Sequence, residues 1–90
     1  MGYRIEFKKN ALRDKDIVLK NPILKKQVKT ILETLAENPY AISQSFEALK
    51  GNLKGKYSRR VDKHNRVVYS IDENCERVIV YSLLNHYDNL

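Results

Sequence analysis

The stretch that decides the fold comprises Lys56-Tyr57-Ser58-Arg59-Arg60-Val61, the turn Asp62-Lys63-His64-Asn65 and the run Arg66-Val67-Val68-Tyr69-Ser70-Ile71. Two runs with β character on either side of a polar turn predict a β-hairpin. Because side chains alternate across a sheet, the length of the turn decides which residues share a face. A turn with an odd number of residues gives one apolar face, which would pack on helices: Tyr57, Val61, Val67, Tyr69 and Ile71. Arg59 also falls on this face, and we expect it near an edge, where its charged head can reach solvent.

The opposite face of the same hairpin is polar and basic. It would carry Ser58, Arg60, Arg66, Val68 and Ser70. Like charges that lie opposite one another destabilise a bare sheet. The two arginines are therefore tolerable only if a phosphate comes between them or an acid neutralises them, and Glu47 on the preceding segment is a candidate for that acid.

The segments around the hairpin predict two helices and further strands. Asn21 and Pro22 suit the cap and first position of a helix. The apolar residues that follow form one stripe at helical spacing: Leu24, Val28, Ile31, Leu32 and Leu35. Asn38-Pro39 ends this helix, and a first helix is expected over 11–20 with Asn10 as its cap. Strands are expected over 3–7 and 77–84, with a short one over 46–49. The 77–84 strand should be central in the sheet.

This order predicts a single α+β domain over residues 1–90. An N-terminal strand comes first, then a two-helix hairpin, then an antiparallel meander sheet with the helices on one face. No apolar run approaches the roughly 20 residues of a membrane span, and Cys75 is the only cysteine. We therefore expect no membrane partner and a location in the reducing cytoplasm. The net charge of +6 favours polyanionic partners, although solubility alone is an equal alternative.

A set of four side chains fits the cleavage of RNA. RNA carries its own nucleophile, the 2′-hydroxyl, so transesterification needs a base, cations for the phosphorane and an acid for the leaving oxygen. Glu47 can be the base, Arg60 and Arg66 the phosphate clamp, and His86 the acid. Tyr87 can stack on a base or position the phosphate. With two histidines and no HExxH or Gly-rich phosphate loop, we expect no metal and no cofactor.

The residues that carry this chemistry resemble a known family. They run from Phe46 to Val61, continue with Arg66-Val67-Val68-Tyr69 and end at His86-Tyr87. The spacing is similar to that of the RelE superfamily, closest to its Txe/YoeB branch. In that branch a Glu-x-Leu-Lys segment leads into Leu-x-Gly-x-aromatic-Ser-Arg-Arg. A His-Arg-Leu-Val-Tyr segment and a terminal His-Tyr follow.

The resemblance implies the toxin of a type II toxin–antitoxin system. Such a toxin is an mRNA interferase, an endoribonuclease that enters the A site of the 30S subunit and cuts the codon there. A cognate antitoxin protein holds it inactive, and homodimers or toxin–antitoxin hetero-oligomers are possible. The resemblance assigns the base to Glu47, the clamp to Arg60 and Arg66, and the acid and its neighbour to His86 and Tyr87. It also implies RNA contacts at four basic positions: Lys50, Lys54, Lys56 and Arg59.

The sequence departs from the family pattern at several positions. Asn65 stands in place of the usual His, Leu84 in place of an Arg, and Ala48 in place of a frequent Pro. These departures concern base preference and leave the acid, base and clamp in place. Two alternatives stay open: a gyrase-inhibiting, ParE-like toxin without catalysis, and a basic module that only binds RNA or the ribosome.

Overall fold

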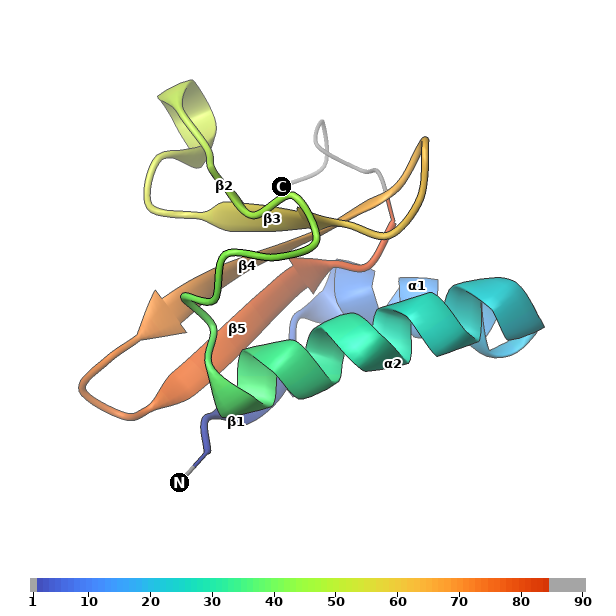
Figure 1. The fold of residues 1–90 in the computed structure, drawn as a ribbon, viewed down its shortest axis with the longest axis horizontal. Helices are drawn as coiled ribbons and strands as arrows, with labels where there is room; N and C mark the ends of the chain where they lie inside the picture. The colour runs from blue at the N-terminus through green and yellow to red at the C-terminus, as the bar shows by residue number, and fades with distance from the viewer. Residues whose placement is uncertain (1, 85–90) are drawn as a thin grey trace.

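The computed structural model describes residues 2–84. Two helices cover one face of a five-stranded sheet, and the opposite face carries no helix within the described chain (Figure 1). The elements in chain order are β1 (Arg4–Phe7), α1 (Lys9–Leu19), α2 (Pro22–Glu37), β2 (Glu47–Ala48), the short 3-10 helix η1 (Gly51–Leu53), β3 (Tyr57–Arg60), β4 (Arg66–Asp72) and β5 (Arg77–Ser82). The predicted α+β class is confirmed.

The sheet is mixed, with strand order β1-β5-β4-β3-β2. Strands β2 to β5 form the predicted antiparallel meander, and β1 adds in parallel to β5. The last strand was expected to be central. It is an interior strand between β1 and β4, but β4 holds the middle position. It also ends at Ser82, two residues before the predicted end.

Local sequence explains α2 better than it explains α1. The Asn21 side chain accepts hydrogen bonds from the backbone N–H groups of Ile23 (3.1 Å) and Leu24 (3.2 Å), so the predicted cap is confirmed. The prediction that Asn10 caps α1 is wrong, because α1 begins at Lys9. The preceding Lys8 donates its N–H to the Val80 carbonyl at 2.8 Å. Tertiary pairing with β5 therefore sets the start of α1, where no side-chain cap is needed.

The core lies between the two helices and the sheet. Helix α2 supplies Val28, Ile31 and Leu35, and the sheet supplies Val67, Tyr69, Val78 and Val80, all at most 3% exposed. The pairing of Arg60 with Arg66 leaves five residues, 61–65, between the strands. That odd number is the condition for the predicted alternation, so the prediction that Tyr57, Val67 and Tyr69 share the helix-covered face is confirmed.

The prediction that Arg59 lies near an edge of the sheet and contacts RNA is wrong. It is 0% exposed. Its guanidinium donates to the Tyr69 hydroxyl and to the carbonyls of Ser43 and Pro39, each at 2.9 Å. The same group lies 4.7 Å from the centre of the Phe46 ring. The segment between α2 and β2 folds over the sheet with its carbonyls directed inward, and Arg59 ties that segment to the core. Sequence pattern gave no indication of those acceptors.

We predict that Arg59→Leu lowers the free energy of unfolding by about 2–4 kcal/mol, because it leaves buried carbonyls without donors. Urea denaturation followed by circular dichroism measures the loss. The neighbouring Arg60 is exposed, so Arg60→Leu is the matched control and should change stability by less than about 0.5 kcal/mol. Equal stability losses in the two variants would contradict the anchoring role of Arg59.

Tyr69 makes the core sensitive to alkaline pH. Burial raises the pKa of Tyr69 to about 12, although the nearby Arg59 guanidinium acts in the opposite direction. An unfolded tyrosine titrates near 10. The neutral Tyr69 phenol therefore contributes fully to the free energy of unfolding below about pH 10. This contribution is lost as the pH rises from about 10 through 12. Hydrogen bonds to Glu73 also raise the pKa of Tyr3 and Tyr40. The urea midpoint should therefore fall over this range in the native chain, and fall less steeply in Tyr69→Phe.

Candidate active site

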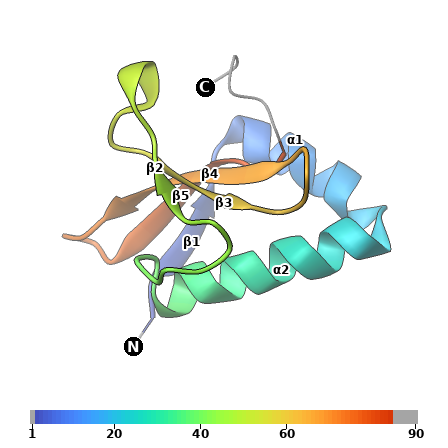
Figure 2. The same cartoon turned by 45° about the horizontal axis from the view of Figure 1, so that its top comes forward.

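The face of the sheet that carries no α-helix was predicted to be polar, and its residues differ in exposure: Ser58 and Val68 are fully buried, whereas Arg66 and Ser70 are half-buried. Antiparallel partners share a face, and the register pairs Glu47 with Ser58 and Arg60 with Arg66. Ser58 alternates with Arg59, so the backbone register assigns Glu47, Ser58 and Arg66 to the face away from the helices, where Ser58 itself is fully buried. The strand order puts β2 at the edge of the sheet farthest from β1, with β3 next to it, and Figure 2 shows η1 standing out from the sheet above β2. The candidate site is thus built at one edge of the sheet.

Glu47 and Arg66 are in contact. Their Oε1 and Nη2 atoms are 3.8 Å apart, and the two side chains are 62% and 19% exposed respectively. The Arg66 guanidinium is held mainly by neutral acceptors, because its Nε donates to the Ser58 hydroxyl at 2.8 Å and its Nη2 to the Ser45 carbonyl at 2.6 Å. Neutral acceptors orient the guanidinium without cancelling its charge. An ion pair this long and this exposed contributes little stability, so Glu47 is easily separated from Arg66.

Arg60 lies beside Arg66 but is held differently. Within residues 2–84 no hydrogen bond or ion pair fixes its guanidinium. Arg60 lines a groove of about 570 Å³ together with residues of α2, among them Lys26, Gln27 and Thr30. The structure therefore brings the Glu47 and Arg66 side chains together. Arg60 is paired with Arg66 in the strand register, while its side chain lines the groove shared with α2.

The predicted lysines surround this edge of the sheet. Lys50 and Lys54 flank η1 and are exposed. Lys56 is half-buried, and its ammonium lies 4.7 Å from the centre of the Tyr81 ring. The Tyr81 hydroxyl lies 3.0 Å from that of Ser70. The pairing of β4 with β5 shifts next to Tyr81, and such a bulge re-aims side chains. Sequence reasoning missed Tyr81, although its alternation with Val78 and Val80 predicts that it lies on the open face.

His86 and Tyr87 lie outside the described residues. The chain that leads toward them is described as far as Leu84. The predicted alternation from Val78 through His86 stops at Ser82, because the consecutive Leu83 and Leu84 are both in the core, 1% and 8% exposed. The face of His86 therefore does not follow from strand parity.

Two negative findings apply to the described chain. Residues 2–84 contain no group of three or more His, Cys, Asp or Glu side chains placed to bind a metal ion. None of the helices in the same range is long and apolar enough to span a membrane.

Comparison with solved structures shows which class of proteins shares this fold. A toxin from Agrobacterium tumefaciens described as YoeB/ParE superposes with a TM-score of 0.85 at 21% identity, covering 93% of this chain and 99% of that one. The YoeB–YefM toxin–antitoxin complex from Staphylococcus aureus contains a chain with a TM-score of 0.81 at 29% identity, covering 94% and 98%. The architecture is that of the RelE-like toxins.

The family follows from sequence. The family model described as "YoeB-like toxin of bacterial type II toxin-antitoxin system" matches residues 7–87. Toxin YoeB from Synechocystis sp. is 31% identical over 64 residues, which cover 71% of this chain and 72% of that protein. This chain belongs to the YoeB-like family of type II toxins.

Proposed function

We propose that this toxin is an endoribonuclease that cleaves mRNA in the ribosomal A site, in the cytoplasm, by attack of the 2′-hydroxyl on the scissile phosphate. The observation that carries the proposal is the contact between the Glu47 carboxylate and the Arg66 guanidinium on an open, helix-free face, with Arg60 paired to Arg66. A carboxylate beside one guanidinium, with a second arginine on the neighbouring strand, supplies the groups that phosphoryl transfer from RNA needs. Family membership supports it, since YoeB-like toxins are generally known to cleave mRNA.

The mechanism uses each group once. Glu47 removes the proton from the 2′-hydroxyl, and the 2′-oxygen then forms a bond to phosphorus. Arg66 and Arg60 bind the phosphate oxygens, whose charge grows in the transition state. The bond to the 5′-oxygen breaks, and His86 donates a proton to that leaving oxygen. The products are a 2′,3′-cyclic phosphate and a 5′-hydroxyl, and the RNA itself supplies the nucleophile.

The Glu47–Arg66 contact is suited to opening on substrate binding. At 3.8 Å and with Glu47 largely exposed, the pair is weak, and a phosphate offers Arg66 a stronger, bidentate partner. Phosphate binding then leaves Glu47 beside the sugar as a free carboxylate. Lys50, Lys54 and Lys56 are placed to contact the RNA backbone nearby. Arg59 is not part of this proposal, because its guanidinium is buried.

We predict that Glu47→Gln, Arg66→Ala and His86→Ala each lower the cleavage rate by about 10²-fold or more, the usual scale for acid–base and electrostatic groups. Purified protein is added to programmed ribosomes, and the mRNA is checked for cuts with 2′,3′-cyclic phosphate or 3′-phosphate ends. His64→Ala is the matched control, because His64 lies exposed in the β3–β4 turn, and it should retain full activity.

The same experiment separates the alternatives. A loss in His64→Ala equal to that in His86→Ala would reject His86 as the acid. Intact mRNA together with inhibited gyrase supercoiling would point instead to a ParE-like inhibitor. Intact mRNA on ribosomes that bind the protein tightly would point to a binding module without catalysis.

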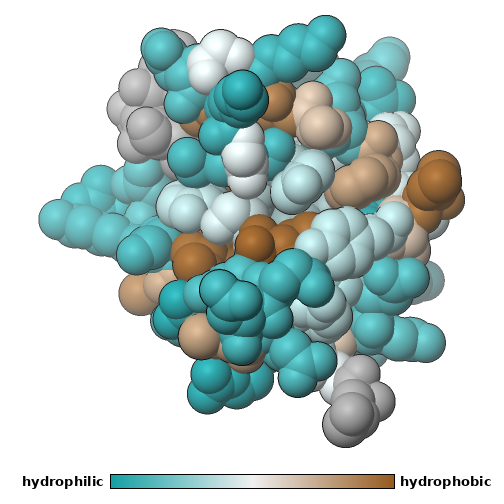
Figure 3. Space-filling model, turned by 90° about the vertical axis from the view of Figure 1, so that its left-hand side faces the viewer, coloured by the Kyte–Doolittle hydropathy of each residue, from teal (hydrophilic) through white to brown (hydrophobic). Residues whose placement is uncertain are grey.

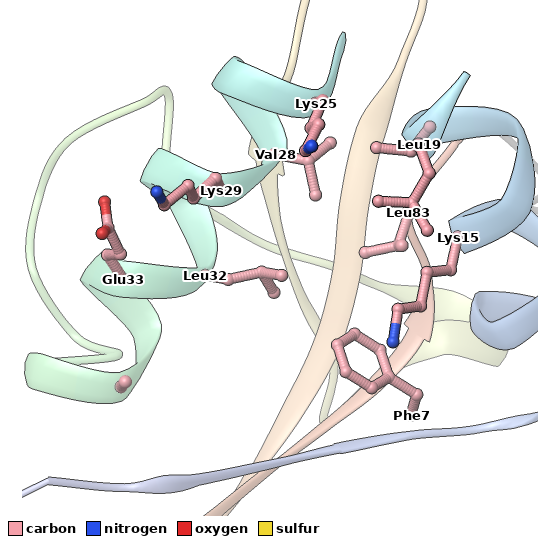
Figure 4. Close-up of a pocket in the computed structure, with 11 residues that line it drawn as sticks. Phe7, Lys15, Leu19, Lys25, Val28, Lys29, Leu32, Glu33 and Leu83 are labelled. Carbon is pink, nitrogen blue, oxygen red and sulfur yellow. The ribbon is translucent and has the colours of Figure 1, made fainter. Parts of the chain in front are cut away.

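We also propose an antitoxin protein as partner, docked in a groove between α1 and α2. The groove has a volume of about 370 Å³ and an apolar floor that includes Val28, Leu32 and Leu83. Figure 4 shows these side chains with Lys25 and Lys29 of α2 on one side and Lys15 of α1 on the other. The charged residues of the lining are three lysines and one acid, Glu33, so the rim is net positive. An apolar floor with such a rim fits an amphipathic segment with acidic flanks. The S. aureus relative is itself in complex with the antitoxin YefM.

We predict that Lys29→Glu weakens antitoxin binding about tenfold, because it places a negative charge beside the acidic flank. Calorimetric titration with the product of the short reading frame adjacent to the toxin gene measures the change. Lys63→Glu makes the same change of charge in the exposed β3–β4 turn, and its affinity should match that of the native chain. Equal affinities for Lys29→Glu and the native toxin would contradict docking in this groove.

A further inference from the structure

Asp14 is a buried acid that the proposed chemistry does not use. It lies on α1, is 3% exposed, and faces the point where the chain leaves β5. Its Oδ2 atom accepts hydrogen bonds from the backbone N–H groups of Leu83 at 3.0 Å and Leu84 at 3.1 Å. The Ser82 hydroxyl lies 3.3 Å from the same oxygen and also contacts the Leu84 carbonyl. One carboxylate oxygen therefore accepts from the backbone N–H groups of two consecutive residues, and the Ser82 hydroxyl lies beside it.

From this geometry we infer that Asp14 is a positioning residue for the C-terminal segment. It fixes the direction of the chain after β5 and thereby sets where the His86–Tyr87 pair begins. The inference rests on the proposed function for its catalytic consequence, although the anchor itself is independent of any activity.

The choice of a carboxylate at this place needs a physical reason. Burying an ionised carboxylate costs far more than burying an apolar side chain of similar size, unless strong hydrogen bonds compensate. Backbone N–H groups that point at an anion form such bonds, which are about twice as strong as those between neutral groups. At the end of β5 the N–H groups of Leu83 and Leu84 have left the sheet ladder and need acceptors. Asp14 supplies the acceptor, and the charge makes the anchor stiff.

The anchor acts close to the candidate acid. His86 follows Leu84 by two residues, and covalent geometry alone limits the distance between their Cα atoms to about 7 Å. The side chains of Leu83 and Leu84 are buried, so the Asp14 bonds and the core together fix the backbone up to Leu84. A general acid must lie within hydrogen-bond reach of its leaving group, and a shift of about 1 Å is enough to cost 10²-fold in rate. Loss of the anchor should therefore slow the chemical step more than it weakens RNA binding.

The test combines a structural and a kinetic readout on the full-length chain. In Asp14→Ala and Asp14→Asn, amide hydrogen exchange of Leu83 and Leu84 is followed by NMR, together with the imidazole resonances of His86 and His64. Cleavage is measured as separate kcat and KM values on programmed ribosomes. Asp16→Ala is the matched control, because Asp16 is an exposed acid on the same helix.

We expect the two amides to exchange at least about tenfold faster in Asp14→Ala and by an intermediate factor in Asp14→Asn, which keeps one acceptor oxygen. The His86 resonance should move and the His64 resonance should stay. We also expect kcat to fall about tenfold or more in Asp14→Ala, with KM nearly constant. Asp16→Ala should match the native chain in every readout. If Asp14→Ala does not fold, Ser82→Ala removes the hydroxyl that lies between Asp14 and the Leu84 carbonyl without changing the charge, and it should give the same pattern in smaller degree.

The outcomes separate this inference from the proposed function. Unchanged amide exchange, or an unchanged His86 resonance, would overturn the anchor whatever the activity. Faster exchange with native kcat would show a role in stability alone and would overturn the positioning role. If the native chain does not cleave mRNA, the proposed function fails, and the exchange and resonance data still decide whether Asp14 positions the segment.

Discussion

The geometry of the site depends on the length of the turn between β3 and β4. The Asp62 carboxylate holds this turn by accepting from the N–H groups of His64 at 2.8 Å and Asn65 at 2.9 Å. Those bonds, with the His64 backbone first, keep the pKa of Asp62 below its usual range. A shift of one residue would exchange the two faces of the hairpin. Arg59 would then meet solvent, and Arg60 would enter the core.

The consequence of this register is a like-charge pair on an open sheet. Arg60 opposite Arg66 is unfavourable, and the described chain relieves it only in part. Ser58 and Ser45 orient the Arg66 guanidinium, while Glu47 approaches to 3.8 Å and stays mostly exposed. A sheet selected for stability alone would carry neutral residues here. Figure 3 shows that hydrophilic residues dominate the side of the molecule that it presents. A phosphate bound as proposed would relieve repulsion between the two arginines.

Much of this arrangement could be predicted from local sequence, because α2 and the hairpin follow from caps, apolar spacing and strand alternation. The failures share a physical cause. Arg59 is buried because carbonyls of an irregular segment reach it, and α1 begins at Lys9 because Lys8 pairs with β5. Nothing in the sequence distinguishes Asp14 from the exposed charges of α1, because its partners are backbone N–H groups of Leu83 and Leu84. Each of these features depends on backbone groups that come into contact only in the folded chain. Such contacts produce no periodic pattern of residue types in the sequence.

The buried contacts of Arg59 and Asp14 matter for the proposed function, because the proposed base and acid are both close in sequence to irregular backbone. Glu47 begins a strand of only two residues, and the segment before it is tied to the core by the buried guanidinium of Arg59. His86 follows a bend tied to α1 by the buried carboxylate of Asp14. Short strands cannot fix a side chain by ladder hydrogen bonds alone. Two buried side chains, Arg59 and Asp14, are each bonded to backbone groups and fix these segments on the helix side of the sheet. The Glu47 and Arg66 side chains that we propose to act on RNA lie on the other side.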